Sequence, residues 1–282
     1  MTPLRPRSML FTLFGDYAYP SEREVWLGSL VLLGRELGIA AGATRSAVAR
    51  LARAGWIRAR KSKNRSHYGL TEAGRRLIEE GTQRIYHSGE QDWDGTWCLL
   101  LYSIPETKRM LRDRVRKRLA WLGFGALGGG AYASARDMGG PASALVEGFG
   151  VGAFASIFTA KLRGPERDAD LVRRCWDLPV IAHHYERFID HYAPRYRRDA
   201  ARLTAGTLSD EDAFAARFAL THDFRRFPFV DPDLPDSLLP ENWAGTRARR
   251  LFEDYHRKLA RGALRHFNAV LRVERIPPSS AH

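Results

Sequence analysis

The sequence has few cysteines, and it lacks any apolar run long enough to cross a membrane. Only Cys98 and Cys175 occur among 282 residues, without a Cys-x-x-Cys pair, which indicates two reduced thiols in a cytoplasmic protein. No uncharged stretch reaches the ~20 residues that a membrane span needs; the apolar stretch at 148–160 has thirteen. The N-terminal residues 1–5 lack the apolar region of a signal peptide, so no signal peptide is expected. We therefore expect a soluble protein of the cytoplasm with no membrane partner.

Acidic residues are missing from one part of the chain. The whole sequence has 45 Lys and Arg against 32 Asp and Glu, a net charge of +13. Residues 1–70 hold twelve of these cations and only four of the acids, and no acidic residue lies between Glu36 and Glu72. A solvated surface normally mixes both signs. The one-sided stretch indicates an anionic partner, and we expect that partner to be nucleic acid.

The N-terminal quarter has the periodicity of helices followed by strands. Apolar residues recur first at helical spacing and then at a spacing of about two. The pattern predicts helices over 8–18, 22–37 and 43–54, strands over 56–60 and 66–70 around a turn at 61–65, and a further helix after Thr71. This order predicts a winged helix-turn-helix that binds double-stranded DNA.

The helix over 43–54 is predicted to read the DNA. At about 100° per residue, one of its faces carries Val48, Leu51 and Ala52, which can pack inward. The opposite face consists of cationic and small residues: Arg45, Ser46, Ala49, Arg50 and Arg53. The small residues keep the helix slim enough for a major groove about 12 Å wide, and arginine can bind guanine or phosphate through two hydrogen bonds. A merely solvated arginine face is the alternative interpretation.

The predicted hairpin carries a second group of candidate DNA contacts. The group consists of Lys61, Lys63, Asn64, Arg65 and His67. A polar, cationic tip suits phosphates or a minor groove, and it is expected to add salt-dependent affinity more than sequence choice. The alternative is an exposed turn without a ligand.

A different organisation begins near residue 92. The pattern predicts a strand at 97–104, a helix at 106–122, two short glycine-bounded strands that end at 131–134, a strand at 154–160 and a helix at 166–176. This order predicts a ferredoxin-like domain. From residue 182 the chain is expected to be helical except at the proline-rich 228–242. We thus predict an α+β protein with three domains, at 1–90, 91–181 and 182–282.

Few residues suggest catalysis, and we expect neither an enzyme nor a cofactor. The chain has no G-x-S-x-G or Walker A sequence. His184 and His191 would lie about 10 Å apart along one helix, too far to share a metal ion without a third element. No metal site is therefore predicted from them or from their neighbours His183 and Asp190.

A basic run between residues 108 and 118 is a candidate site for a small ligand. On the predicted helix most of its cations point away from the apolar face. Arg109, Arg112 and Arg116 are the candidates for binding the phosphates of an effector. The alternative is a solvated helix face.

Several segments resemble the PaaX-type transcriptional repressors of bacterial phenylacetate degradation, over nearly the whole chain. The matching segments are SMLFTLFGDYAYP at 8–20, VWLGSL at 25–30, RSAVARLARAGWI at 45–57, YGLTEAGRR at 68–76, WCLLLYSIPE at 97–106 and RFPFVDPDLPDSLLPENWAG at 226–245. The last is the most distinctive, because no general physical rule requires it. The resemblance implies a winged-helix head, a middle domain similar to Cas2 and a helical C-terminal domain. It also implies a homodimeric repressor of a phenylacetate-type operon, released by an aryl-CoA thioester such as phenylacetyl-CoA.

The Cas2-like implication raises nuclease activity as an alternative function. In that family the first strand ends in a Tyr-Asp pair whose carboxylate holds a metal ion, whereas the matching positions here are Tyr102 and Ser103. A serine cannot replace a carboxylate as a ligand of a hard metal ion. A metal-dependent nuclease is therefore disfavoured. A regulator of another pathway with a non-CoA effector stays open as a second alternative.

Overall fold

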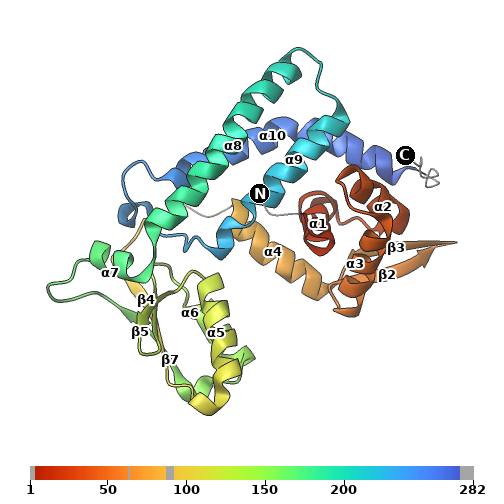
Figure 1. Ribbon diagram of the computed structural model, residues 1–282. Coiled ribbons are helices and arrows are strands. Elements are labelled where there is room, and N and C mark those ends of the chain that lie inside the picture. The colour runs from red at the N-terminus through yellow and green to blue at the C-terminus, as the bar shows by residue number, and fades with distance from the viewer. Residues whose placement is uncertain (1–3, 63, 87–91, 274–282) are drawn as a thin grey trace. The chain divides into compact units, whose positions relative to one another are not determined.

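The computed structural model describes residues 4–62, 64–86 and 92–273 (Figure 1). The chain divides into two compact units, which we call unit 1 and unit 2. Unit 1 consists of Met1–Tyr86, Asp190–Arg225 and Arg249–His282, and unit 2 of His87–Ile189 and Arg226–Ala248. Both units combine helices with an antiparallel sheet, so the chain has the predicted α+β class. The division into domains at 1–90, 91–181 and 182–282 stays a prediction.

The N-terminal part of unit 1 consists of helices followed by a hairpin. Its elements are α1 (Pro6–Leu13), β1 (Val25–Trp26), α2 (Leu27–Glu36), α3 (Ala41–Arg53), β2 (Ile57–Ser62), β3 (Arg65–Leu70) and α4 (Glu72–Tyr86). A π-helical turn over Phe14–Ala18 and a 3-10 turn over Tyr19–Ser21 follow α1. The three strands form an antiparallel sheet in the order β1-β3-β2. Helices α2 and α3 therefore come directly before a hairpin to which a third short strand is added.

The expected helix over 22–37 is wrong for its first five residues. Glu22 has a left-handed backbone with φ of 50°, and Val25 and Trp26 pair with Tyr68 and His67 of β3. A β-branched and an aromatic residue favour a strand, and pairing with β3 supplies hydrogen-bond partners for their backbone groups. The helix therefore begins only at Leu27.

Unit 1 has a core to which both ends of the sequence contribute. The C-terminal helices are α8 (Leu178–Thr204), α9 (Asp210–Phe224) and α10 (Ala244–Leu271). The buried core includes Leu13, Tyr17, Leu30, Leu33, Val48 and Leu51 from the N-terminal part, and Phe214, Phe218, Ala263 and Phe267 from α9 and α10. The rings of Tyr17 and Phe214 lie 5.2 Å apart. The N-terminal helices thus bury their apolar faces partly against α9 and α10.

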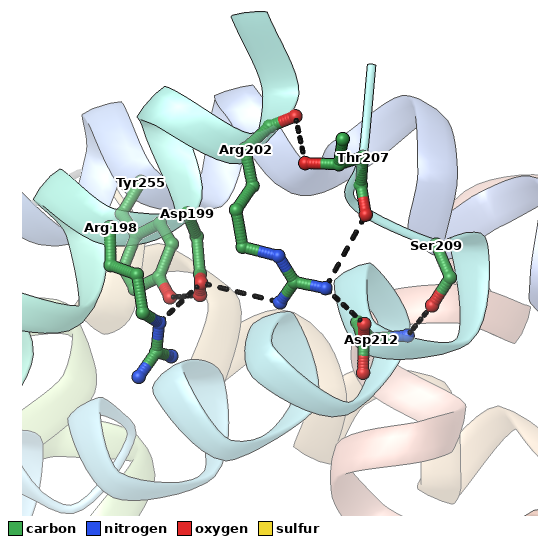
Figure 2. A network of polar contacts seen from close by, with 7 residues as sticks. All are labelled: Arg198, Asp199, Arg202, Thr207, Ser209, Asp212 and Tyr255. Carbon is green, nitrogen blue, oxygen red and sulfur yellow. Dashed lines mark hydrogen bonds and ion pairs between the residues drawn. The ribbon is translucent and has the colours of Figure 1, made fainter. Parts of the chain in front are cut away.

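A polar network connects α8, α9 and α10 within unit 1, as Figure 2 shows. The buried Asp199 of α8 accepts a hydrogen bond of 2.5 Å from the hydroxyl of Tyr255 on α10. Nη2 of Arg202 lies 2.7 Å from Oδ2 of Asp212 on α9. Ser209 caps α9 by accepting a hydrogen bond from the Asp212 amide at 3.0 Å. These contacts hold the end of α8 to the first turn of α9 and the middle of α10.

The main part of unit 2 is a four-stranded antiparallel sheet packed against helices. Its elements are β4 (Trp97–Tyr102), α5 (Arg109–Trp121), β5 (Gly125–Gly128), β6 (Ala131–Ser134), α6 (Gly139–Gly148), β7 (Ala155–Ala160) and α7 (Asp168–Cys175). The strand order β5-β6-β4-β7 is that of a ferredoxin-like split βαβ sheet. Figure 1 shows α5 and α6 beside this sheet. The buried core of unit 2 includes Leu100, Val115, Leu119 and Leu145.

Helix α6 is an element that the sequence-based prediction lacks. It begins with the sequence Gly-Gly-Pro at 139–141, residues that have low propensity for a helix interior but are tolerated in a first turn. Ala142, Leu145 and Val146 are buried at the spacing of one helix face. Packing against the sheet therefore stabilises a helix that composition disfavours.

The segment between α9 and α10 is irregular, as predicted for 228–242. It contains two 3-10 turns, Phe227–Phe229 and Asp236–Leu238. Its residues from Arg226 onward belong to unit 2, where Tyr185 of α8 stacks on Phe227 with ring centroids 3.9 Å apart. The segment is thus an ordered part of unit 2.

Candidate nucleic-acid interface

Helix α3 presents one face to the core of unit 1 and a cationic face to solvent. Thr44, Ala47, Val48 and Leu51 are buried. All five of the predicted contact residues on this helix are exposed: Arg45, Ser46, Ala49, Arg50 and Arg53. The structure therefore brings these side chains to one surface, as the helical projection indicates. Their contact with DNA stays a prediction.

Helix α3 packs closely on α2 at a glycine. A Cβ atom added to Gly34 of α2 would lie 2.6 Å from Oγ1 of Thr44, too close for the two atoms to coexist there. Thr44 is fully buried, and its hydroxyl donates a hydrogen bond of 3.4 Å to the carbonyl of Ala40 before α3. The glycine thus allows the close approach that holds α3 with its other face outward.

The arginines of α3 have no carboxylate partner in the part of the chain that the structure describes. Two acidic residues that precede α3 pair with side chains outside this helix. Glu24 binds Arg60 at 2.5 Å, and Glu36 lies 2.8 Å from Nε2 of His266. The positive charge of this face is therefore available to an anionic partner.

The β2–β3 hairpin exposes only part of its predicted contact group. Lys61 and Asn64 are exposed near the tip of the hairpin. The last pair of the β2–β3 ladder is Ser62 with Arg65; Lys61 comes directly before Ser62, and Asn64 directly before Arg65. Lys63 lies outside the described residues. Two exposed polar side chains on a projecting turn suit contacts with phosphates more than with base edges.

Arg65 and His67 lie against the body of the hairpin. The guanidinium of Arg65 lies 4.9 Å from the centre of the Trp26 ring, a cation–π contact. His67 pairs with Trp26 across β1 and β3 and is half-buried. Both residues therefore take part in holding β1 on the hairpin, a role that spacing in the sequence does not reveal. Their contact with DNA stays a prediction.

Arg58 is an exposed cation that sequence reasoning did not include. It lies on β2 two residues before Arg60, and both are exposed. Arg60 is paired with Glu24, whereas no carboxylate pairs with Arg58 among the described residues. The signal in the sequence is the alternation of arginines along the predicted strand. Arg58 is thus a further candidate for a phosphate contact.

The three cations predicted to bind an effector are not gathered at one site. All three lie on α5. Arg112 and Arg116 line a cavity of about 460 Å³, whereas Arg109 is exposed and is not one of its lining residues. Arg112 is also paired with Glu106 at 2.5 Å. Of the three candidates, only Arg112 and Arg116 therefore line the same cavity.

Neither a metal site nor a nucleotide loop is found within 4–62, 64–86 and 92–273. No three His, Cys, Asp or Glu side chains gather there in a way that could hold a metal ion. A G-x-G-x-x-G sequence occurs at 123–128, but it follows helix α5 and leads into strand β5, whereas a dinucleotide site needs it between a strand and a helix. In the same residues, no helix combines the length and apolarity of a membrane crossing.

The two cysteines are free thiols in unit 2. Burial raises the pKa of Cys175 to about 11 and raises the pKa of Cys98 as well. Both thiols are therefore protonated at neutral pH, which makes them poor nucleophiles and poor metal ligands.

Comparison with known proteins gives a consistent result along the chain. Three family models match: a PaaX-like protein over 5–74, a PaaX protein central Cas2-like domain over 90–172, and a PaaX-like protein C-terminal domain over 176–269. The transcriptional repressor PaaX of Escherichia coli (strain K12) is 35% identical over 265 residues, which are 93% of this chain and 83% of that protein. Among solved structures, the uncharacterized protein Rv0674 from Mycobacterium tuberculosis is similar with a TM-score of 0.59 and 21% identity, over 93% of this chain and 96% of that one. This last similarity concerns the fold alone.

Proposed function

This chain belongs to the PaaX-like protein family, and on that basis we propose that it is a transcriptional repressor that binds double-stranded DNA. The observation that carries the proposal is the exposed face of α3. Arg45, Arg50 and Arg53 lie on that face, and none of them has an ion pair in the described ranges. An unneutralised row of guanidinium groups on a slim helix is complementary to a groove bordered by phosphates.

In this proposal the residues up to about 90 act as a winged helix-turn-helix. Helix α3 enters the major groove, where the small Ser46 and Ala49 permit a close approach. Arg50, in the middle of the exposed face, donates two hydrogen bonds to a guanine edge. The wing supplies contacts to phosphates or to the minor groove through Lys61, Lys63, Asn64, Arg65 and His67.

The proposed repressor acts as a homodimer on an operator with two half-sites. A single recognition helix reads only a few base pairs, so two copies are needed for a site of useful specificity. The half-sites would lie about one helical turn apart, because each α3 must meet the major groove from the same side of the duplex. Such a protein works in the cytoplasm, where the operator is.

Release from DNA is proposed to follow the binding of an effector, an aryl-CoA thioester such as phenylacetyl-CoA. An effector can shift the protein away from DNA only if it binds the DNA-free form more tightly than the bound form. The regulated genes would be those of phenylacetate-type catabolism. Unit 2 contains the cavity lined by Arg112 and Arg116, which supports a sensing role for this part of the chain.

The central Cas2-like domain is proposed to serve regulation and not catalysis. Ser103 directly follows β4, at the position where the resemblance to Cas2-type nucleases implies a carboxylate. A hydroxyl binds Mg²⁺ or Mn²⁺ too weakly to replace that ligand. The protein should therefore show no metal-dependent cleavage when it is incubated with DNA and Mn²⁺. A parallel reaction with a chelator should look the same.

A DNA-binding assay tests the proposed function. The full chain is titrated into a labelled fragment from upstream of its own gene and, in parallel, into a shuffled fragment of the same composition. Specific binding about 10³-fold tighter than binding to the shuffled fragment is expected. The absence of any retarded band at low salt would overturn the proposal, because low salt favours every phosphate contact.

A further inference from the structure

Two cavities in unit 2 adjoin each other and share Arg116, Ala126 and Tyr132 in their linings. Their volumes are about 500 and 460 Å³, within the range of small-molecule sites. We propose that together they form one binding site for an anionic small molecule that carries an aromatic or similarly flat apolar group. This inference rests on the proposed function, in which the molecule is the effector. Arg116 lies where the anionic and the apolar parts of that molecule meet.

The smaller cavity is polar. The rings of Tyr102 and Tyr132 stack with centroids 5.5 Å apart, and their hydroxyl oxygens lie 3.4 Å from each other. One hydroxyl donates to the other, so the second keeps a proton that it can donate to a ligand. Burial, together with the hydrogen bond to Tyr132, raises the pKa of Tyr102, which keeps its phenol neutral and able to donate.

A glycine turn leaves room at the edge of this cavity. The turn is the run of glycines at 128–130, all with positive φ, from the last residue of β5 to the start of β6. A Cβ atom at Gly130 would collide with the carbonyl oxygen of Tyr102. The absence of side chains at 128–130 leaves the backbone itself to border the cavity, where it can approach a ligand closely.

The charge of the joint site is positive. Arg116 and Lys117 are exposed on α5 and have no ion pair within the described part of the chain. Arg112 contributes a third cation, although Glu106 neutralises part of its charge at 2.5 Å. Asp113 is the acidic residue in the lining of the larger cavity. Two cations unpaired among the described residues and the partly neutralised Arg112, against one carboxylate in the lining, favour an anion such as a carboxylate or phosphate.

The larger cavity has apolar walls that are open to solvent. Phe229 is 64% exposed and Val230 is 49% exposed, although both are large hydrophobic residues. The ring of Phe229 lies 4.5 Å from that of Trp121, and Trp176 stacks on Trp97 with centroids 6.4 Å apart. A flat apolar group that entered between Phe229 and Trp176 would remove this surface from water.

The position of Phe229 and Val230 follows from how the segment 226–245 is held. Nε of Arg136 donates to the carbonyl of Asp233 at 2.6 Å, and its Nη2 lies 2.8 Å from Oδ2 of the same residue. Gly123, with φ of 87°, lets Pro232 approach so closely that an added Cβ would lie 2.5 Å from the Pro232 carbonyl oxygen. These contacts hold the segment next to the cavity. The most distinctive motif of the sequence therefore forms a wall of the proposed site.

Calorimetric titration of the full chain tests the site with three probes: phenylacetyl-CoA, coenzyme A and phenylacetate. Arg116→Gln should weaken the binding of phenylacetyl-CoA about tenfold through the loss of a charge-assisted contact. Phe229→Ala should weaken it about fivefold and leave the weaker binding of coenzyme A unchanged, because coenzyme A lacks the aromatic group. Phe229 is mostly exposed, so its replacement should lower the Tm only slightly, through the lost contact with Trp121.

Matched controls come from the same unit. Arg114→Gln removes a cation two residues earlier on α5, and Phe158→Ala removes a phenylalanine on β7 that is 50% exposed; neither residue lines either cavity. Both controls should bind phenylacetyl-CoA as the wild type does. Equal affinity in all four variants, or no binding of any probe to the wild type, would overturn the proposal.

The titration and the DNA assay fail independently. Ligand-free Arg116→Gln should bind the promoter fragment with wild-type affinity, because the residue belongs to unit 2 and α3 to unit 1. If the wild type bound phenylacetyl-CoA at this site and bound no DNA, the proposed function would be wrong and the ligand site would stand. If the wild type bound DNA and the four variants were indistinguishable in the titration, the ligand site would be wrong and the proposed function would stand.

Discussion

Nη2 of Arg217 lies 2.9 Å from Oδ1 of Asp16, and the two side chains are only 8% and 4% exposed. The pair joins the turn after α1 to α9, 201 residues later in the chain. Oδ1 of Asp16 also lies 2.8 Å from Nε2 of His256, and Oδ2 accepts a hydrogen bond of 3.2 Å from Thr221. A carboxylate at this depth is tolerated because charged and polar groups surround it. The network therefore ties the N-terminal helices to α9 and α10 within unit 1.

Replacing Asp16 with alanine is expected to destabilise the protein strongly. The change leaves the buried guanidinium of Arg217 without its counter-charge, and losing one partner of a buried ion pair costs about 3–5 kcal/mol. The free energy of unfolding in urea, followed by circular dichroism, measures the loss. Asp254→Ala is the control, since Asp254 and its partner Arg257 are both largely exposed, and it should cost less than about 1 kcal/mol. Similar losses in the two variants would contradict the buried network.

Stability is also expected to fall in acid through Asp16. Burial alone would raise the pKa of Asp16, but hydrogen bonds and charges from His256 and Arg217 hold that pKa below its ordinary value of 3.8. A carboxyl with a lower pKa in the folded state stabilises the fold above its unfolded pKa, and the contribution is lost as the pH falls through the folded pKa. As the pH falls below about 5 and on through the folded pKa, the free energy of unfolding should therefore drop more steeply in the wild type than in Asp16→Asn. Parallel pH profiles would count against this role.

The sequence predicts the surface of α3 far better than it predicts this network. Residues within one helix share a face by spacing alone, and Arg45, Arg50 and Arg53 are all exposed as the projection indicates. Asp16 and Arg217 are related by no local period, and only the packing of α9 against the N-terminal helices brings them together. A long-range pair of this kind is beyond any local pattern.

Local propensity is a weaker guide where packing opposes it. Helix α6 forms in spite of its Gly-Gly-Pro start because Leu145 and Val146 are buried against the sheet.

The candidate ligand site likewise combines residues that local spacing predicts with residues that only the packing of the sheet brings to them. Arg112 and Arg116 lie one turn apart on a predicted helix, but Tyr132 joins them only because β6 pairs with β4 and β5. The sequence therefore predicts two cations of the candidate site, Arg112 and Arg116, and misses Lys117, while the sheet topology supplies its aromatic part.

Gly34→Ala is expected to lower stability although alanine favours helices. The new Cβ would lie 2.6 Å from Oγ1 of the buried Thr44, and such overpacking costs about 1–3 kcal/mol against about 1 kcal/mol gained from helix propensity. Gly42→Ala on α3 is the control, because nothing lies within 4 Å of an added Cβ there, and it should be neutral or stabilising. Thermal unfolding compares the two variants. An unchanged Tm in Gly34→Ala would mean that α2 and α3 do not approach this closely.

Arg50→Ala is expected to weaken binding to the cognate operator by about 1–3 kcal/mol and to relax the preference for one base pair, because a bidentate contact to a base is lost. Fluorescence anisotropy with operator and random DNA measures both effects. Arg197→Ala, at an exposed position of α8 in unit 1, is the control and should leave both affinities unchanged. An equal loss of affinity for operator and random DNA would show that Arg50 contacts phosphate and not a base.

Lys61→Ala is expected to weaken binding to all DNA sequences alike and to flatten the salt dependence. A lysine that neutralises one phosphate releases counterions, so its loss should make the slope of log K against log salt shallower by about 0.9. Lys63→Ala is expected to act in the same way, whereas Lys258→Ala, exposed on α10, should leave the slope unchanged. Anisotropy titrations at several salt concentrations give the slopes. A phosphate contact carries no information about the base, so a changed preference for the operator with an unchanged slope would mean that the β2–β3 hairpin reads sequence.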